Sequence, residues 1–521
     1  MDSISEHVDV AIVGGGINGA GLAFDAVRRG LNVALFEQHD FGFGASTATS
    51  KLAHGGLRYL ENYQFNLVKE SINERNFLLD QASHLVKPLQ FYIPIYKDMP
   101  WKTWKLRLGL NVYDWMQSHK TLPSHRMLSP KDVTTDIPWI KRDNLLNAAS
   151  YYDAQMEDHR LIMELLLMSK KEGANIYNYT KVQNLQPKKN GVSMDVSTQN
   201  HNVVTTSASS VVLATGAWNN QFSKAPLVKP TKGVHIVLPD MDLPVALLLV
   251  HPKDQRIFFV MPWKGHTLIG TTDQKDDQGY DNPTVDAIDT QYLLDGLNHY
   301  HHLKKWEQHH IHHAFCGYRP LIQTSESSPS KQSREETYTW LHPNVLAVSG
   351  GKYTTYRHMA EHAMNLVHHH VFPDRILTKS RTQQVPFIGK LDIHDWPSET
   401  QLNHLSETYH VYRESLIHLI DTYGDLYKQI LNTIKNNKDT AVRLDMELPM
   451  IVAELQYAIE HEWVKTLSDF MFRRTYYGYL YHKNENMLNT AIHHFKAITG
   501  VTTPDDTIRA SIQRHMDACT A

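Results

Sequence analysis

The stretch Val8–Glu37, VDVAIVGGGINGAGLAFDAVRRGLNVALFE, decides the fold of the N-terminal part of this chain. An apolar run from Val8 to Val13 is typical of a buried parallel strand, and the glycine-rich turn after it leads into an amphipathic pattern reaching Arg29. A second apolar run ends at Glu37. Strand, turn, helix and strand in this order predict a βαβ unit with two parallel strands.

The turn of this unit carries the spacing G-x-G-x-x-G at Gly14, Gly16 and Gly19, and the acidic residue Glu37 follows the first glycine by 23 positions. Such glycines permit a tight turn and the close approach of a pyrophosphate. The helix N-terminus adds positive potential, and the carboxylate accepts ribose hydroxyls. We therefore predict that Gly14, Gly16, Asn18, Gly19 and Glu37 bind a dinucleotide. The alternative is a strand-turn-helix unit with a structural role alone.

Two later segments also run from a strand into glycine. SSVVLATGAW reaches Gly216, and NVLAVSGGKYTTYRHMAEHAMNLV passes through Gly350 and Gly351 into a helix, with Lys352 directly after the glycines. A nicotinamide enzyme needs one such crossing, whereas an extended FAD meets a second helix N-terminus that stabilises negative charge on its reduced ring. These junctions favour FAD as the cofactor, bound in part by Gly216, Gly351 and Lys352.

The remainder of the chain divides into a β-rich part and a helical part. Short β-rich runs between positions 229 and 273 alternate with turn-forming residues, as in an antiparallel sheet, and helical periodicity prevails after Pro386. We expect an α/β fold with an FAD-binding Rossmann-like domain, an inserted antiparallel-sheet substrate domain and a C-terminal helical domain. The expected ranges are 1–90, 150–228 and 340–385 for the FAD-binding domain, 91–149 and 229–339 for the substrate domain, and 386–521 for the helical domain.

Composition narrows the class of protein. With 521 residues, 41% of them hydrophobic, the chain can bury more than one core. A net charge of -3 argues against a nucleic-acid-binding protein, which normally carries a basic surplus. Two cysteines, Cys316 and Cys519, cannot form a disulfide framework and indicate a reducing compartment. We find neither a signal peptide nor a run of about 18 apolar residues, so any membrane contact is expected to be peripheral.

Seven segments of the chain form a recognisable set, in the order VAIVGGGINGAGLAFDAVRRGL, SKLAHGGLRYLE, KGVHIVLP, IGTTD, GYRPL, GGKYTTYR and EHEWVKTLSDFMFRRT. Together they resemble a known family, the FAD-dependent glycerol-3-phosphate dehydrogenases of aerobic bacteria and mitochondria. The resemblance implies oxidation of sn-glycerol 3-phosphate to dihydroxyacetone phosphate, with electrons passing from reduced FAD to a membrane quinone. It is closest to the bacterial form, since we do not find the calcium-binding EF-hand loop of mitochondrial relatives.

The resemblance also assigns residues to the site. The expected flavin contacts in its second segment are Ser50, Lys51, His54 and Gly55. The matching substrate-binding positions are Arg58, Tyr59, Arg334, Lys352 and Thr354. Arg334 is matched by its spacing of 15 residues from Arg319. Cations suit this substrate because arginine binds a phosphate dianion bidentately and lysine acts as a point charge.

The reaction requires a base for the proton of the substrate's C2 hydroxyl. Histidine is suited to this task because its ordinary pKa lies near the working pH. We expect His235, in KGVHIVLP, to take the proton, and Arg319, in GYRPL, to orient the oxygen or stabilise its charge. The alternative for His235 is a hydrogen-bonded histidine of the sheet, with an arginine or water accepting the proton.

Histidine clusters occur in NHYHHL, EQHHIHHAF and VHHHVFP, among 33 histidines in the chain. On a strand, His310 and His312 would share a face, a spacing that suits a metal. We expect no metal, because no cysteine or carboxylate partner is placed to complete the set and flavin hydride transfer needs none. Solvated polar faces, and at a helix end a favourable meeting with the helix dipole, explain these clusters better.

The segment Tyr96–Lys120, YKDMPWKTWKLRLGLNVYDWMQSHK, interleaves lysine and arginine with tryptophan and leucine. This mixture suits a segment lying on anionic lipid, and equally a domain-packing helix whose tryptophans face inward. With a membrane quinone as acceptor, we expect a protein peripheral to the cytoplasmic side of the inner membrane, with a homodimer as the candidate assembly.

Three other functions fit parts of the pattern. An oxidase acting on the same substrate would pass electrons to oxygen. An amino-acid oxidase would need a carboxylate clamp, for which the cations suit phosphate better. A non-catalytic flavin-fold binding module would be favoured by loss of Gly14, Glu37, Arg319 or Lys352, all of which are present.

Overall fold

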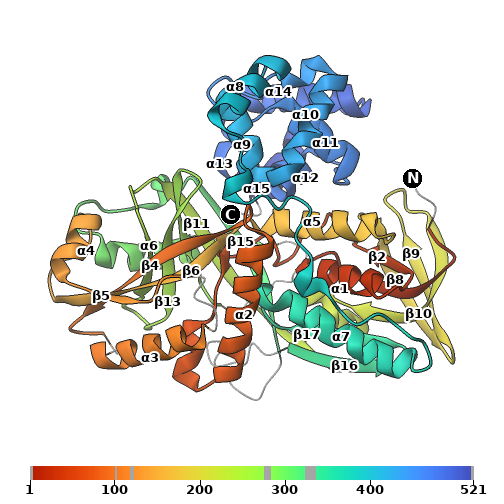
Figure 1. The fold of residues 1–521 in the computed structure, drawn as a ribbon, viewed down its shortest axis with the longest axis horizontal. Helices are drawn as coiled ribbons and strands as arrows, with labels where there is room; N and C mark the ends of the chain where they lie inside the picture. Colours follow the sequence, from red (N-terminus) through yellow and green to blue (C-terminus); the bar gives the residue numbers. More distant parts are fainter. Residues whose placement is uncertain (1–3, 100–101, 118–121, 275–282, 323–335, 518–521) are drawn as a thin grey trace.

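The computed structural model describes residues 4–99, 102–117, 122–274, 283–322 and 336–517, apart from the side chains of Arg58, Glu61, Asn62 and Asp517. Two large sheets lie side by side with helices packed against them, and a helical lobe sits above their junction (Figure 1). This arrangement confirms the predicted mixed α/β fold with a C-terminal helical domain. Among the described helices, none has both the length and the apolar character needed to cross a bilayer.

The first sheet grows around the predicted βαβ unit. Strand β1 (His7–Val13) pairs in parallel with β2 (Val33–Phe36) on one side and with β10 (Val203–Leu213) on the other. The sheet order is β16-β17-β10-β1-β2-β7, with the β8–β9 hairpin joined to β10. The further bounds are β7 (Asn175–Tyr177), β8 (Lys181–Lys188), β9 (Gly191–Ser197), β16 (Glu336–His342) and β17 (Val345–Gly350). The helices packed together on this sheet are α1 (Ile17–Arg28), α5 (Asp158–Lys171) and α7 (Tyr356–Val371).

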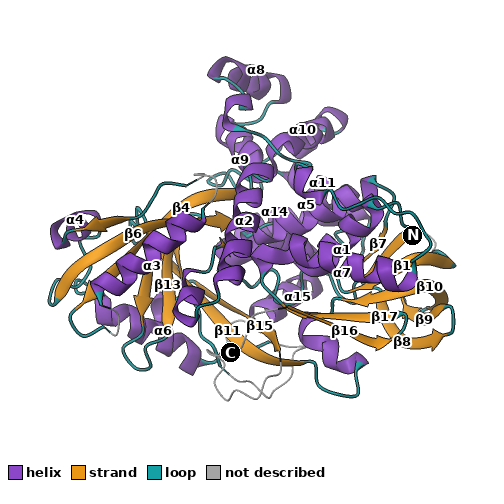
Figure 2. Cartoon of the chain, turned by 60° about the horizontal axis from the view of Figure 1, so that its bottom comes forward, coloured by secondary structure: helices purple, strands orange, loops and turns teal. Residues whose placement is uncertain are grey.

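The second sheet has the order β15-β11-β14-β13-β12-β4-β6-β3, with β5 paired to β6, and most of its pairs are antiparallel. Its strands are β3 (Leu52–Ala53), β4 (Val86–Tyr96), β5 (Arg126–Leu128), β6 (Leu145–Met156), β11 (Val228–Pro239), β12 (Ala246–Val250), β13 (Ile257–Trp263), β14 (His266–Gly270) and β15 (His313–Ile322). The associated helices are α2 (Phe65–Gln81), α3 (Thr103–Met116), α4 (Pro130–Asp136) and α6 (Ala287–Tyr300), and Figure 2 shows α3 and α6 beside the strands.

Sheet membership differs from the expected domain boundaries at three places. Strands β3 and β4 lie in the second sheet although their residues fall within or across the range 1–90. Strand β6 also lies in the second sheet along its whole length, although the FAD-binding domain was expected to resume at 150. Strand β16 of the first sheet begins at Glu336, before the expected start at 340. Buried strands of the two sheets are alike in sequence, so the partner of each strand is decided by long-range pairing rather than by its own pattern.

The C-terminal lobe is helical throughout its regular structure. Its elements are α8 (Glu399–Tyr409), α9 (Arg413–Tyr423), α10 (Tyr427–Asn436), α11 (Val452–His461), α12 (Leu467–Asp469), the π-helical turn η10 (Phe470–Arg474), α13 (Tyr477–Tyr481), α14 (Glu485–Thr499) and α15 (Asp505–Asp517). Buried Phe470 and Phe472 share one apolar core with Trp263 and Phe315 of the second sheet. The lobe therefore continues the core beneath it rather than standing apart.

Candidate active site

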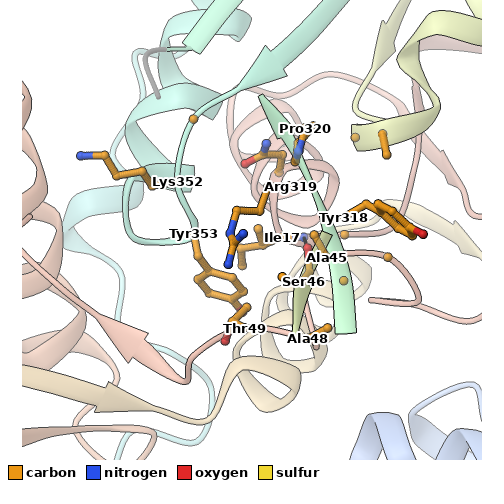
Figure 3. A pocket seen from close by; sticks show the side chains of 18 of the residues that line it. Ile17, Ala45, Ser46, Ala48, Thr49, Tyr318, Arg319, Pro320, Lys352 and Tyr353 are labelled. Atoms are coloured by element: carbon orange, nitrogen blue, oxygen red, sulfur yellow. Dashed lines mark hydrogen bonds between the residues drawn. The ribbon is translucent and has the colours of Figure 1, made fainter. Parts of the chain in front are cut away.

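A cavity of about 410 Å³ lies where the two sheets meet. Its wall is formed by the N-terminal βαβ unit, the segment 43–59, strands β11 and β15, and the turn that follows β17. Figure 3 shows Arg319 on β15 and Lys352 after β17 among the lining side chains. Sites for small molecules usually have volumes of about 300–1,000 Å³. One cavity thus joins the predicted cofactor motif to predicted substrate-binding residues.

The motif glycines bring α1 tightly against the first sheet. Gly14 has φ +110°, and a Cβ there would lie 2.5 Å from the carbonyl oxygen of Ala214. A Cβ on Gly19 would lie 1.8 Å from the carbonyl oxygen of Gly14, so only glycine permits this contact. Gly16 is the N-cap of α1 and lines the cavity. The positive end of α1 is therefore at the cavity wall, where it favours an anion such as a pyrophosphate.

Glu37 and Asn18 line the same end of the cavity. Glu37 accepts hydrogen bonds from the backbone N–H of Gly15 at 2.7 Å and of His39 at 2.8 Å. Burial raises the pKa of its carboxyl group, and these backbone donors partly oppose the rise. The Oδ1 atom of Asn18 is buried and has no hydrogen-bond partner within the described residues. Such an atom is suited to a ligand that supplies the missing donor.

The second glycine-to-helix junction forms another part of the wall. Gly351 has φ +78° and is followed by Lys352, both lining the cavity. The Nζ atom of Lys352 donates to Ser71 Oγ at 2.7 Å and lies 4.1 Å from the centroid of the Tyr59 ring. Thr354 Oγ1 accepts a hydrogen bond from the backbone N–H of His54 at 3.3 Å. The structure therefore brings segments 54–59 and 351–354 together across 300 residues of sequence.

His235 occupies the centre of β11, opposite Gly270 of β14 and Phe315 of β15. Its ring stacks on Phe315, and its Nε2 atom lies 2.8 Å from Ser50 Oγ. The Nδ1 atom is buried with no hydrogen-bond partner in the described part of the chain. Burial lowers the pKa of His235 well below 6.5, and the charges of Arg319 and Lys51 lower it further. The ring is therefore neutral near pH 7.

Arg319 extends from β15 over the neighbouring strand β11. A Cβ on Gly233 of β11 would lie 2.3 Å from its Nη2 atom, so this glycine makes room for the guanidinium group. Arg319 donates to Thr271 Oγ1 at 2.6 Å and to the carbonyl oxygen of Thr272 at 3.1 Å. It also lies 3.4 Å from Asp273. These partners belong to the IGTTD segment, which holds Arg319 at the cavity wall.

Several predicted site residues lie elsewhere. Lys51, expected to contact the cofactor, does not line the cavity, because its side chain turns away into a buried ion pair with Asp158. Gly19 acts through helix packing, and Gly55 does not line the cavity itself but donates its N–H to Oδ1 of the lining residue Asp153 at 3.0 Å. The predicted residues that do line the cavity are Gly14, Gly16, Asn18, Glu37, Ser50, His54, Tyr59, Gly216, His235, Arg319, Gly351, Lys352 and Thr354.

Two predicted cations cannot be placed. Arg334 lies outside the described residues. Arg58 belongs to the short helix η1 (Leu57–Asn62), but its side chain is outside the description. Their contact with substrate stays a prediction.

Sequence reasoning missed part of the wall. Ser46 accepts a hydrogen bond from the N–H of Ile17 at 3.1 Å and so caps the first turn of α1 from another segment. Thr49 and Tyr353 also line the cavity. The run FGFGASTATS, residues 41–50, was the available signal, because so many small residues allow a close approach of backbone to a ligand.

The histidine clusters take no part in this wall. His310 lies in the short helix η3 (Gln308–His310), and His312 precedes β15 with its Nε2 atom beside the carbonyl oxygen of Leu480. The two rings therefore do not share a strand face. In the described ranges, the group of metal-type ligands within 4.8 Å of one another is instead Glu70, Glu336 and His358.

Comparison with known proteins supports the cofactor assignment. The sequence profile described as FAD dependent oxidoreductase matches residues 9–357, and that of the C-terminal domain of alpha-glycerophosphate oxidase matches residues 380–503. A Synechocystis glycerol-3-phosphate dehydrogenase is 32% identical, covering 90% of this chain and 88% of its own. The aerobic glycerol-3-phosphate dehydrogenase of Staphylococcus saprophyticus is 30% identical, covering 94% and 90% respectively.

Solved structures share the fold. The glycerol-3-phosphate dehydrogenase of Bacillus halodurans, complexed with FAD, is similar with a TM-score of 0.80 and 23% identity, covering 99% of this chain and 96% of that one. The L-alpha-glycerophosphate oxidase of Mycoplasma pneumoniae with FAD bound has a TM-score of 0.57 and 17% identity, covering 72% and 97%.

The cavity wall fits FAD on its own evidence. The α1 N-terminus suits the pyrophosphate, the Glu37 carboxylate suits a ribose, and the Asn18 oxygen lacks a partner in the described chain. FAD is the cofactor of this enzyme. Together with the two family profiles and the extent of the matches to curated relatives, the site shows that this chain belongs to the FAD-dependent glycerol-3-phosphate dehydrogenase family.

Proposed function

We propose that this enzyme oxidises sn-glycerol 3-phosphate to dihydroxyacetone phosphate and passes the electrons to a membrane quinone. The observation that carries the proposal is that Arg319 and Lys352 line the same cavity as the glycine-rich elements suited to FAD. A phosphorylated substrate needs fixed cations of this kind, because charge-assisted hydrogen bonds are the strongest that a protein offers to phosphate. The names of the relatives point to the same substrate.

In this proposal the cations bind two different parts of the substrate, the phosphate and the C2 oxygen. Lys352, Arg58 and Arg334 bind the phosphate, with Tyr59 and Thr354 beside them. Lys352 is suited to this because it is buried and held by Ser71, so its charge is fixed before substrate arrives. Arg319 orients the C2 oxygen and stabilises its developing charge. The three hydrogen-bonding partners of the IGTTD segment hold its guanidinium group for that role.

His235 accepts the proton of the C2 hydroxyl. When bound, FAD supplies the acceptor for the hydride that leaves C2. The accepting atom of His235 in this proposal is Nε2, because that nitrogen meets the hydroxyl of the cavity-lining Ser50, whereas Nδ1 is buried with no hydrogen-bond partner in the described residues. The Ser50 hydroxyl lies within hydrogen-bond distance of Nε2 and lines the cavity. In this proposal it therefore lies between the substrate hydroxyl and His235, on the path of the transferred proton. A neutral imidazole is the form needed, and burial keeps it neutral at physiological pH, although a pKa well below 6.5 also makes it a weaker base than an ordinary histidine.

Anaerobic addition of glycerol 3-phosphate to the purified, FAD-loaded enzyme tests the proposal. We expect the flavin absorbance near 450 nm to bleach in a single turnover, whereas glycine leaves it unchanged. Bleaching by glycine and not by glycerol 3-phosphate would assign the enzyme to the amino-acid oxidases. A purified protein without a yellow chromophore would favour a non-catalytic binding module.

The electron acceptor separates two candidates. The match of residues 380–503 to the C-terminal domain of alpha-glycerophosphate oxidase favours the second candidate, an oxidase that releases peroxide. Steady-state turnover with a soluble quinone analogue, compared with oxygen alone, distinguishes them. We expect turnover with the quinone to exceed peroxide release at least tenfold, and the reverse ratio would establish the oxidase.

We further propose that α3 lies on the membrane at the cytoplasmic face. Support comes from Trp104, Leu108 and Trp115, which are exposed to 60%, 57% and 82%, while Leu110 and Tyr113 on the other face are buried. Lys102 and Lys105 are exposed on the same helix and its N-cap. Exposed tryptophan beside lysine suits anionic lipid headgroups over an acyl boundary. Association into a homodimer stays a prediction.

A further inference from the structure

A buried ion pair lies directly behind the active-site segment 49–51. The ammonium group of Lys51 donates to Asp158 at 3.0 Å and 2.8 Å and to the carbonyl oxygen of Thr47 at 2.6 Å. An ammonium group has three donors, so these acceptors satisfy it. Both side chains are fully buried. Although burial alone would raise the pKa of Asp158, the Lys51 charge keeps it below its usual value, so Asp158 is held as a carboxylate.

Asp158 gathers further donors from separate parts of the chain. Its Oδ2 atom accepts from Thr49 Oγ1 at 2.7 Å, and Thr49 lines the cavity. Its Oδ1 atom accepts from the hydroxyl of Tyr476 at 3.1 Å, a residue of the helical lobe. Thr49 Oγ1 also accepts from the backbone N–H of Lys51 at 2.9 Å. One carboxylate therefore links the helical lobe to both neighbours of Ser50.

Ser50 is positioned by this link. Its neighbours on either side, Thr49 and Lys51, are both bonded to Asp158, and Lys51 has the left-handed backbone conformation with φ +56°. A non-glycine residue keeps such a conformation only where its surroundings hold it. The Ser50 hydroxyl then meets His235 Nε2 at 2.8 Å. Loosening the pair would release the backbone that carries this hydroxyl.

Aromatic rings close the other side of the Lys51 ammonium. Its Nζ atom lies 5.0 Å from the ring centroid of Tyr476, 5.3 Å from that of Phe315 and 5.9 Å from that of Tyr479. Phe315 also stacks on His235, so one ring contacts both the buried cation and the proposed base. Two of the three rings come from the helical lobe. None of the lobe's described residues lines the cavity itself.

We propose that the Lys51–Asp158 pair, closed by Tyr476, is a positioning unit that holds Ser50 and His235 in their active arrangement and makes the helical lobe a supporting part of the active site. This inference rests on the proposed function in one respect, the assignment of His235 as the base. Lys51, Asp158 and Tyr476 do not line the cavity, and they act through the residues that do.

The charges around His235 give the unit a measurable signature. The ionisable groups that face the imidazole are Arg319 on β15, Lys51 and Asp158. The two cations disfavour its protonation and the carboxylate favours it. Removal of the Lys51 charge alone therefore makes His235 easier to protonate. The acid limb of any rate that needs neutral His235 then moves to higher pH.

Lys51→Met replaces the ammonium with an apolar chain of similar length and tests the unit in the FAD-loaded enzyme. Stopped-flow reduction of the flavin by glycerol 3-phosphate is expected to slow by about 10- to 100-fold, since small misplacements of reacting groups have effects of this size. The apparent dissociation constant of the substrate is expected to stay within twofold, and the acid limb to move to higher pH. A rate within twofold of wild type with an unchanged pH profile would overturn the inference.

A milder pair of variants keeps the test decisive should Lys51→Met fail to retain FAD. Tyr476→Phe removes the hydroxyl that reaches Asp158, and Tyr477→Phe is the matched control. The control removes a buried hydroxyl from the next residue, bonded instead to Glu454 at 2.8 Å. We expect Tyr476→Phe to slow flavin reduction several-fold relative to Tyr477→Phe. Equal rates in the two variants would overturn the inference.

A crystal structure of the Lys51→Met holoenzyme separates this inference from the proposed function. Ser50 Oγ and His235 Nε2 are expected to lie clearly farther apart than the 2.8 Å seen here. Failure of wild-type enzyme to be reduced by glycerol 3-phosphate would refute the proposed function, and the interatomic distance would still decide whether the pair positions Ser50. An unchanged distance would overturn the positioning role.

Discussion

Asp40→Asn is expected to lower the free energy of unfolding by about 3 to 5 kcal/mol, the usual result of breaking a buried ion pair by removing one partner. Asp40 follows the predicted ribose-binding Glu37 by three residues and is fully buried. It accepts from both Nη atoms of Arg474 at 2.7 Å and 2.8 Å and from Nε of Arg473 at 2.7 Å. Both arginines belong to the π-helical turn η10, so this cluster of one carboxylate and two guanidinium groups, the Asp40 cluster, joins the helical lobe to the FAD-binding domain.

The magnitude follows from the charge and from what remains after its removal. Burial alone would raise the pKa of Asp40, but Arg474 and then Arg473 bring it from 3.8 to about 2. A decrease of this size corresponds to roughly 2 to 3 kcal/mol of stabilisation of the ionised form. Asparagine preserves the shape yet removes the carboxylate partner of the buried Arg474, whereas Arg473 keeps its ion pair with Asp469 at 2.6 Å, and the uncompensated charge adds to the loss.

The same cluster also makes the stability of the fold depend on pH in acid solution. The folded-state pKa is lower than the unfolded-state value, so the stabilisation is complete above pH ~4 and is lost as the pH falls through about 2. Wild-type stability is therefore expected to fall more steeply with acidification over this window than that of Asp40→Asn, whose residue 40 does not titrate.

Urea unfolding followed by far-UV circular dichroism provides the measurement. The control is Asp505→Asn, which removes an exposed partner of Lys496 by the same chemical change. We expect the control to keep the wild-type midpoint. A decrease in the free energy of unfolding of under about 1 kcal/mol in Asp40→Asn, or equal decreases in both variants, would refute the assignment of the Asp40 cluster as a strong contact between domains.

Three further outcomes are expected. Gly19→Ala should purify without FAD, as judged by absorbance near 450 nm, because its Cβ would lie 1.8 Å from a backbone carbonyl oxygen; the control Gly109→Ala, with open space at its Cβ, should stay yellow. His235→Asn should keep FAD yet reduce it about 100- to 10,000-fold more slowly in stopped flow, and near-normal rates would remove it from the base role. Replacement of Trp104 and Trp115 by glutamine should abolish flotation with anionic liposomes; undiminished flotation would place the membrane contact elsewhere.

The N-terminal unit illustrates what sequence determines directly. Its strand, helix and turn are set by residues within 30 positions of one another, through apolar periodicity and through backbone conformations that only glycine permits. Gly14 and Glu37 are therefore assigned by local pattern alone, and both line the cavity. The second glycine junction at Gly351 was predictable for the same reason.

Tertiary structure alone decided the rest, because it depends on which distant segments meet. Lys51 lies in a motif of expected flavin contacts, yet Asp158, more than 100 residues later, turns its ammonium away from the cavity. The partners of His235, the sheet to which β6 belongs and the docking of Arg474 on Asp40 likewise depend on long-range packing. Local patterns specify backbone geometry and residue chemistry, whereas the direction of a buried charge depends on where its partner lies in the folded chain.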